Sequence, residues 1–239
     1  MKINKDSDRR FGFHSIESII KLNPHKIKKL FVPYSRKDKR IEDLIDLAKK
    51  YDIKYEHSKK LKQDPEALIK KEVLLSFKDL KEFLVNDNNY LLLVIDNVID
   101  PRNLGACLRS AAVLNVDGVI INKHHCAPLN EVAHNVSAGG IEALKIYHVS
   151  NLINCIKHLR SLDINIFGLS EHASNNFFEM NFKESCALIV GSEEIGVRKK
   201  TLEACNYNIC LSDNNDFKSF NVSVATGIIL SEAIRQRKC

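Results

Sequence analysis

The stretch Leu91-Leu-Leu-Val-Ile-Asp-Asn-Val-Ile-Asp-Pro-Arg-Asn-Leu-Gly-Ala-Cys-Leu-Arg109 decides the fold of this chain of 239 residues. It opens with an apolar run of strand length and passes through a polar turn into a helix of small and apolar residues. Asp100 is a suitable helix N-cap, and Pro101 suits the first helical position. The stretch therefore predicts a buried strand that leads directly into a helix, the repeating unit of parallel α/β sheets.

The same alternation continues to the end of the chain. Predicted strands are Leu91–Asp96, Gly118–Asn122, Leu144–His148, Ile164–Leu169, Ala187–Gly191 and Tyr207–Leu211. Predicted helices are Leu104–Leu114, Leu129–Ser137, Leu152–Leu162, Arg198–Cys205 and Val222–Arg237. Several of these strands are apolar throughout, as expected when helices cover both faces of a sheet. Residues 90–239 therefore predict one α/β domain with a parallel sheet.

The N-terminal part predicts a smaller α/β unit. Its expected elements are a helix over 13–22, a strand over 30–33, a helix over 41–48 and a strand over 53–55. Residues 58–72 are rich in lysine and contain Asp64-Pro65, which predicts a loop and a short helix. We therefore expect a small domain over 1–75, a linker over 76–89 and a larger domain over 90–239.

Positive charge is concentrated near the N-terminus. Residues 1–40 carry 12 Lys and Arg against 4 Asp and Glu, whereas residues 91–239 carry 14 against 15. The asymmetry predicts that the N-terminal segment contacts a polyanion, and backbone phosphates of a nucleic acid suit it. The alternative is a lysine-rich surface that serves solubility alone, because the net charge of the whole chain is only +6.

Several classes of site and protein are disfavoured by the sequence. The seven cysteines are scattered without a C-x-x-C pair, and His124-His125-Cys126 has no fourth ligand at useful spacing, so we expect free thiols and no metal. No G-x-G-x-x-G loop or P-loop follows a strand. No apolar run approaches the roughly 20 residues of a membrane span, and the N-terminus lacks a signal peptide, which predicts a cytoplasmic protein.

Two further blocks follow predicted strands near the C-terminus. In Val190-Gly-Ser-Glu-Glu-Ile-Gly196, two of the nine glycines of the chain bracket two glutamates. They fit a tight turn that caps a helix, or a backbone that a ligand approaches closely. In Ser219-Phe-Asn-Val-Ser-Val-Ala225, Ser219 or Asn221 suits a helix cap, while the amide of Asn221 could instead orient a ligand.

The first block also holds polar residues that helix capping does not explain. Arg102 and Asn103 follow the cap, and Arg109 lies within a helix of otherwise small and apolar residues. A guanidinium in that setting needs a partner or a role, and from this block alone both interpretations stay open.

In this order the three blocks resemble the motifs of the SpoU family of RNA 2′-O-ribose methyltransferases, within the SPOUT superfamily. Asn103 and Arg109 fit the family's N-x-x-x-x-x-R pattern. Gly191, Glu193 and Gly196 fit G-x-E-x-x-G, and residues 219–223 fit S-L-N-V-S. Phe11-Gly-Phe-His-Ser-Ile16 is similar to the start of the family's RNA-binding domain, which resembles ribosomal protein L30e.

This resemblance implies a parallel-sheet domain with a C-terminal trefoil knot, an otherwise very rare feature, preceded by a small L30e-like α/β domain. It implies a homodimer that uses S-adenosyl-L-methionine (AdoMet) to methylate a ribose, guanosine being the expected nucleoside, in large-subunit ribosomal RNA. The implied catalytic residues are Arg109, Asn103, Glu193 and Asn221. The implied cofactor-binding residues are Gly191, Gly196, Leu211, Ser219 and Phe220.

The role of Arg109 is open at the level of sequence. The family's proposed base is this arginine, which the other subunit could supply. A guanidinium stays protonated at neutral pH, so we favour an electrostatic partner for a developing alkoxide or a neighbouring phosphate. Asn103 and Glu193 are then expected to hold Arg109 and the ribose, and Asn221 the cofactor or substrate.

The chain departs from the family pattern in three places. Leu211-Ser-Asp-Asn-Asn215 stands where an I-P-M-x-G stretch is usual, Phe220 replaces a leucine, and no H-Q-G occurs near Lys71. The first two departures leave cofactor affinity open, and the third leaves the RNA target open. The alternatives are therefore a tRNA ribose methyltransferase and a catalytically weakened RNA-binding member of the family.

Overall fold

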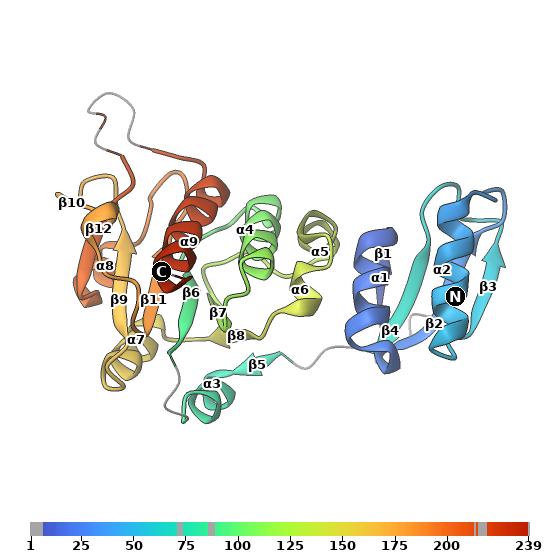
Figure 1. The fold of residues 1–239 in the computed structure, drawn as a ribbon, viewed down its shortest axis with the longest axis horizontal. Helices are drawn as coiled ribbons and strands as arrows, with labels where there is room; N and C mark the ends of the chain where they lie inside the picture. Colours follow the sequence, from blue (N-terminus) through green and yellow to red (C-terminus); the bar gives the residue numbers. More distant parts are fainter. Residues whose placement is uncertain (1–6, 71–73, 86–88, 213, 215–218, 239) are drawn as a thin grey trace.

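A computed structural model of the protein describes residues 7–70, 74–85, 89–212, 214 and 219–238. It contains a four-stranded sheet and an eight-stranded sheet, which lie towards opposite ends of the long axis (Figure 1). The small sheet is formed by residues before 71, and the large sheet by residues after 74. The basic residues of the N-terminal segment are therefore separated in space from the three sequence blocks.

The small sheet has the order β1-β4-β2-β3. Its strands are β1 (Ser7–Phe11), β2 (Ile27–Pro33), β3 (Tyr55–Ser58) and β4 (Glu66–Lys70), and its helices are α1 (Phe13–Leu22) and α2 (Lys39–Lys50), with a 3-10 turn at Pro24–Lys26. Strand β3 is parallel to β2, whereas β4 is antiparallel to both β1 and β2. Strand β3 therefore forms one edge of this sheet, the edge furthest from the large sheet in Figure 1.

Residues 59–65 form the expected loop, but the short helix expected within residues 58–72 is wrong, because β4 occupies a central place in the small sheet. Ala67 and Ile69 alternate into its core with 0% and 1% exposure. Three apolar residues beside Asp64-Pro65 give a weak local signal, and pairing with two distant strands decides the conformation. Strand β1 lies in a segment for which the sequence predicts no element.

The large sheet has the order β10-β12-β9-β11-β6-β7-β8-β5. Its strands are β5 (Leu75–Ser76), β6 (Leu91–Ile95), β7 (Gly118–Asn122), β8 (Ile146–Val149), β9 (Asn165–Leu169), β10 (Asn175–Asn176), β11 (Cys186–Val190) and β12 (Tyr207–Cys210). Every pairing between these strands is parallel. The predicted α/β fold with a parallel sheet is confirmed.

The helices of this part alternate with its strands. They are α3 (Phe77–Phe83), α4 (Pro101–Val113), α5 (Glu131–Ser137), α6 (Gly140–Ala143), α7 (Leu152–Arg160), α8 (Lys199–Ala204) and α9 (Val222–Lys238), with a 3-10 turn at Phe177–Glu179. The segment 76–89, expected as a linker, contains α3. Leu80 of α3 is fully buried in the same hydrophobic cluster as Tyr147 of β8. Asp100 caps α4 as expected, because its side chain accepts a hydrogen bond from the Arg102 N–H.

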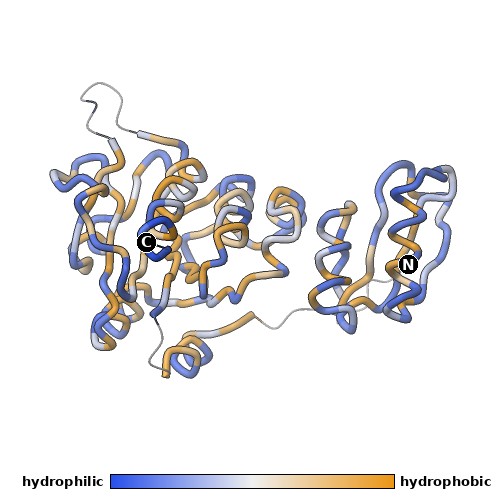
Figure 2. The backbone as a smooth tube through the Cα atoms, viewed as in Figure 1, coloured by the Kyte–Doolittle hydropathy of each residue, from blue (hydrophilic) through white to orange (hydrophobic). Residues whose placement is uncertain are grey.

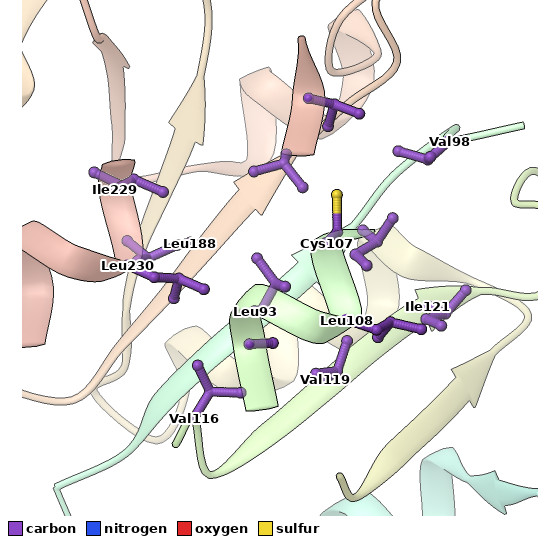
Figure 3. Packing of buried hydrophobic residues seen from close by; sticks show 14 of the residues in the cluster. Leu93, Val98, Cys107, Leu108, Val116, Val119, Ile121, Leu188, Ile229 and Leu230 are labelled. Carbon is purple, nitrogen blue, oxygen red and sulfur yellow. The ribbon is translucent and has the colours of Figure 1, made fainter. Parts of the chain in front are cut away.

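Two hydrophobic clusters cover the two faces of the large sheet. Leu91, Leu93 and Ile95 of β6 join residues of α4 and α9, whereas Leu92 and Val94 join residues of α3 and α7. Figure 3 shows Leu108 of α4 close to Val119 and Ile121 of β7, with Cys107 of the same helix above them. Strands β6 and β11 are buried on both faces, and both are apolar throughout, as expected for a covered parallel sheet. Figure 2 colours β6 as hydrophobic, whereas β3, the edge strand of the small sheet, is coloured as hydrophilic.

Candidate active site

The loop after β11 folds back as a narrow hairpin. Ser192 and Gly196 exchange two backbone hydrogen bonds, of 2.8 and 3.2 Å. A Cβ placed on Gly191 would lie 2.1 Å from the carbonyl carbon of Gly196, so residue 191 has no room for a side chain. Gly196 adopts φ +68°, a left-handed conformation that favours glycine. Both glycines of the second block are thus required by backbone geometry.

Three polar side chains from distant segments meet beside this hairpin. Glu193 Oε1 accepts hydrogen bonds from Asn103 Nδ2 at 2.5 Å and from Asn221 Nδ2 at 2.7 Å. Asn221 Nδ2 also lies 3.3 Å from Asn103 Oδ1. The three residues come from α4, the β11–α8 loop and the segment before α9, so one residue of each sequence block enters a single network.

Asn221 caps α9 and also contacts Glu193. Its Oδ1 accepts hydrogen bonds from the Ser223 N–H at 3.0 Å and from the Ser223 hydroxyl at 2.6 Å, which caps the first turn of α9. Its Nδ2 donates to Glu193. The cap therefore fixes the amide with its donor directed at the carboxylate, and the structural and functional interpretations are compatible.

A cavity of about 420 Å³ opens beside the network at the carboxyl ends of β9, β11 and β12. All five residues expected to bind a cofactor line it: Gly191, Gly196, Leu211, Ser219 and Phe220. Glu171, Glu193 and Glu194 place carboxylates in the same wall, beside His172 and Lys199. In parallel α/β sheets, ligands bind at this edge. Asp213 and Asn215 of the departing stretch, together with Asp216, lie outside the described residues.

Arg109 is not brought to this network within one chain. It follows Asn103 by six residues on α4, so the two side chains point about 120° apart around the helix axis and lie about 9 Å apart along it. Arg109 is exposed, and no described side chain pairs with its guanidinium. Val113, one turn further on the same face of α4, is 77% exposed. The structure therefore joins Asn103, Glu193 and Asn221 and leaves Arg109 on the outer surface of α4.

One contact behind the hairpin was missed at the level of sequence. Asp96 directly follows β6 with 0% exposure, and its carboxylate accepts hydrogen bonds from Arg198 Nε at 2.9 Å and Nη2 at 2.7 Å. Asn97 Nδ2 donates to the Ser192 hydroxyl at 3.3 Å. Together these bonds tie both ends of the hairpin to the end of β6. An aspartate directly after five apolar residues was the available signal, since a buried charge requires a partner.

Cysteine thiols and metal-binding groups are the other candidates for reactive chemistry. Burial raises the pKa of the Cys107 and Cys155 thiols to about 12, so both stay protonated at neutral pH. The six cysteines within the described residues are free. In that same part of the chain, no group of three or more His, Cys, Asp and Glu could hold a metal ion. None of its helices is long and apolar enough to cross a membrane.

Comparison with known protein families gives two matches. Residues 90–231 match the family described as the SpoU rRNA Methylase family. Residues 11–64 match the family described as RNA 2′-O ribose methyltransferase substrate binding. The first match spans every strand of the large sheet except β5 and includes all nine residues of the predicted site, and the second spans β2 and β3 of the small sheet with both of its helices.

Two curated relatives match over nearly their full length. The 23S rRNA (guanosine-2′-O-)-methyltransferase RlmB of Shewanella oneidensis is 34% identical over 244 residues, which cover 98% of this chain and 99% of the relative. The protein of the same name from Escherichia coli is 31% identical over 241 residues, with coverage of 97% and 99%.

A solved structure agrees with the fold. The SpoU methyltransferase AviRb of Streptomyces viridochromogenes superposes with a TM-score of 0.81, covering 98% of this chain and 90% of its own. Its complex with the cofactor AdoMet superposes with a TM-score of 0.78. At 20% identity this likeness establishes the arrangement of both sheets and their helices.

Proposed function

The chain belongs to the SpoU rRNA methylase family, and from this premise we propose that it transfers a methyl group from AdoMet to the 2′-oxygen of a guanosine ribose in 23S rRNA. The observation that carries the proposal is the network in which Glu193 accepts hydrogen bonds from Asn103 and Asn221 at the mouth of the cavity. Each of the three family motifs contributes one residue to this network.

The cavity fits AdoMet in size and charge. Its volume of about 420 Å³ lies within the range of small-molecule sites, about 300–1,000 Å³. The absent side chain at Gly191 lets a ligand lie against the backbone of the hairpin. Carboxylates of Glu171, Glu193 and Glu194 suit a cationic sulfonium. The cofactor, when bound, supplies an electrophilic methyl group, and every other task falls to the protein.

The protein's task is to hold the ribose hydroxyl in line and to stabilise the charge that develops on its oxygen. Positioning of this kind contributes up to about 7–11 kcal/mol in the best intramolecular cases. The amides of Asn103 and Asn221 fix Glu193 in one orientation, so its second oxygen, Oε2, is available to accept a hydrogen bond from the ribose 2′-hydroxyl and then the proton that this hydroxyl loses as its oxygen takes the methyl group. A protonated guanidinium near the attacking oxygen then stabilises the developing alkoxide.

That guanidinium is Arg109 of a partner subunit in a homodimer. Within one chain Arg109 faces away from the network, on the exposed face of α4 that also carries Arg102 and Val113. Val224 of α9, the helix that packs beside α4, is 48% exposed, and Ile99 before α4 is 66% exposed. Exposed apolar residues at both ends of α4 and on α9 support a surface that another protein covers. A two-fold pairing through α4 and α9 would cover them and bring each Arg109 to the other subunit.

We assign RNA binding to the small L30e-like domain over 1–75, and methyl transfer to the domain over 90–239. Support comes from its match to a substrate-binding family and from the positive charge of residues 1–40. The RlmB relatives cover both parts of the chain, which favours rRNA over tRNA as the target. The C-terminal trefoil knot is a further expectation for the fold of the family.

The test is methyl transfer from labelled AdoMet by the full chain, with in vitro transcribed 23S rRNA and total tRNA as parallel substrates. We expect label in 23S rRNA at one guanosine, mapped by its resistance to alkaline cleavage, and none with Glu193→Gln. Label in tRNA alone would establish the tRNA alternative. AdoMet binding by calorimetry without transfer to either RNA would contradict the assigned reaction, and absence of AdoMet binding would identify a purely RNA-binding protein.

A further inference from the structure

The carboxyl edge of β2 and β3 combines an exposed aromatic ring with a cluster of lysines. Tyr34 directly follows β2, and its side chain is 57% exposed. His57 of β3 lies beside it, with ring centroids 6.4 Å apart at 90°. Lys59 Nζ lies 5.6 Å from the centroid of the Tyr34 ring. The ring is thus held from two sides, although much of its surface faces solvent.

The two loops that carry these residues form one surface. The Tyr34 N–H donates to the Ser58 carbonyl at 3.1 Å, and Arg36 Nη1 donates to the Gln63 carbonyl at 2.9 Å. Arg36 itself is anchored over the buried ring of Phe13, 4.8 Å from its centroid. These bonds fix residues 34–36 against residues 58–63, so the side chains on both loops keep a constant arrangement.

The charge of this surface is positive. Lys37, Lys59, Lys60 and Lys62 are all exposed, and within the described residues no carboxylate forms an ion pair with any of them. Arg36, in contrast, pairs with Asp38. Four ammonium groups on the two loops that carry the open ring suit a ligand that offers both phosphates and a planar face. Proteins bind unpaired nucleotides with this combination of lysines and stacked aromatic rings.

We propose that this surface, formed by Tyr34, Lys37, His57, Lys59, Lys60 and Lys62, binds an unpaired nucleotide of the RNA substrate, whose base stacks on Tyr34. The proposal rests on the proposed function, since it takes RNA as the substrate. The surface lies on the edge of the small sheet furthest from the large sheet (Figure 1). The bound nucleotide is therefore remote from the methylated ribose, and the contact contributes to RNA affinity rather than to the chemical step.

The test measures filter binding of 23S rRNA to the full chain, together with kcat and KM for methyl transfer. We expect Tyr34→Ala to weaken RNA binding about 5- to 100-fold and to raise KM with kcat nearly unchanged. Tyr34→Phe should bind within about twofold of the native chain because it keeps the ring. Lys59→Gln should reduce the dependence of log affinity on log salt by about 1.

Matched controls come from the opposite end of α2. Lys50 Nζ lies 5.8 Å from the ring centroid of Tyr51, which is 37% exposed, and the neighbouring Lys49 is paired with Asp46. This pair therefore repeats the contact between ring and ammonium group at a place where carboxylates accompany the lysines. Tyr51→Ala and Lys50→Gln should leave RNA affinity unchanged. Native-like affinity of Tyr34→Ala, in a preparation whose native chain binds and methylates 23S rRNA, would overturn the proposal. A native chain that neither binds nor methylates RNA would instead refute the proposed function.

Discussion

Arg10 Nε lies 3.3 Å from Glu142 Oε1, and this ion pair joins the small sheet to α6 of the larger part. The side chains are only 8% and 3% exposed. The same oxygen accepts a hydrogen bond from the Ser15 hydroxyl at 3.3 Å and lies 2.8 Å from His134 Nδ1 of α5. Glu142 is thus the shared acceptor of an interface that sets the orientation of the proposed RNA-reading domain.

Replacing this acceptor should weaken the interface strongly. Glu142→Gln leaves the buried guanidinium of Arg10 without a counter-charge, and removal of one partner of a buried pair costs about 3–5 kcal/mol. We expect that loss in denaturant unfolding, or an increase in the radius of gyration by small-angle scattering if the domains separate while folded. The exposed pair Lys49–Asp46 is the control, and Lys49→Ala should cost less than about 1 kcal/mol. Equal effects of the two substitutions would contradict the assigned role.

The interface should also weaken in acid. Burial raises the pKa of Glu142, but the hydrogen bond and charge of His134 and the charge of Arg10 outweigh it and hold the pKa below the usual 4.5. A carboxyl group with a lowered pKa in the folded state stabilises that state above its unfolded pKa, and loses this contribution as pH falls through the folded value. The stability difference between native chain and Glu142→Gln should therefore be constant at neutral pH and shrink below about pH 4.5. A difference that is unchanged at pH 3 would show that folding does not lower the pKa of Glu142.

The two glycines of the hairpin should respond differently to alanine. Gly191→Ala places a Cβ 2.1 Å from the Gly196 backbone, so the hairpin must open and AdoMet affinity should fall more than tenfold. Gly196→Ala meets no atom within 4 Å and has only the cost of a left-handed conformation, about 1–2 kcal/mol. Calorimetry with AdoMet separates the two effects. A Gly196 variant that loses cofactor binding while Gly191→Ala retains it would reverse the assignment.

Arg109→Ala should reduce kcat about 100- to 1,000-fold, the usual effect of removing one electrostatic stabiliser, with the dimer folded and AdoMet still bound. Subunit mixing tests where the side chain acts. Arg109→Ala and Glu193→Gln are each inactive, but their mixed dimer contains one site with a native Glu193 and the partner's native Arg109. After random exchange we expect about one quarter of the native rate. No recovery in a mixture shown to exchange subunits would place Arg109 in the site of its own chain.

Much of the large domain could be predicted from sequence because its signals are local. The apolar runs of β6, β7 and β11 are buried on both faces, so each is visible without knowledge of its neighbours. The three motifs were equally accessible, since each carries glycines or amides at a strand exit. The convergence of Asn103, Glu193 and Asn221 was not, because the residues are up to 118 positions apart and only the strand order brings them together.

The misses share a physical cause. Strand β4 and the pair of Asp96 with Arg198 depend on partners far along the chain, and local propensity contains no information about them. The exposed position of Arg109 follows from its angle on α4 relative to Asn103, a consequence of helix geometry that a motif pattern does not express.

The place of β11 between β6 and β9 dictates an order of events during synthesis. Strand β9 leaves the ribosome before β11, but in the finished sheet β11 lies between β9 and β6. Strand β9 therefore cannot join the sheet until β11 has been synthesised. Pairing across such a sequence distance is slow, because a long loop closes first. The small domain, complete by residue 70, can meanwhile fold. A nascent chain is therefore able to engage RNA before it has a place for the methyl donor.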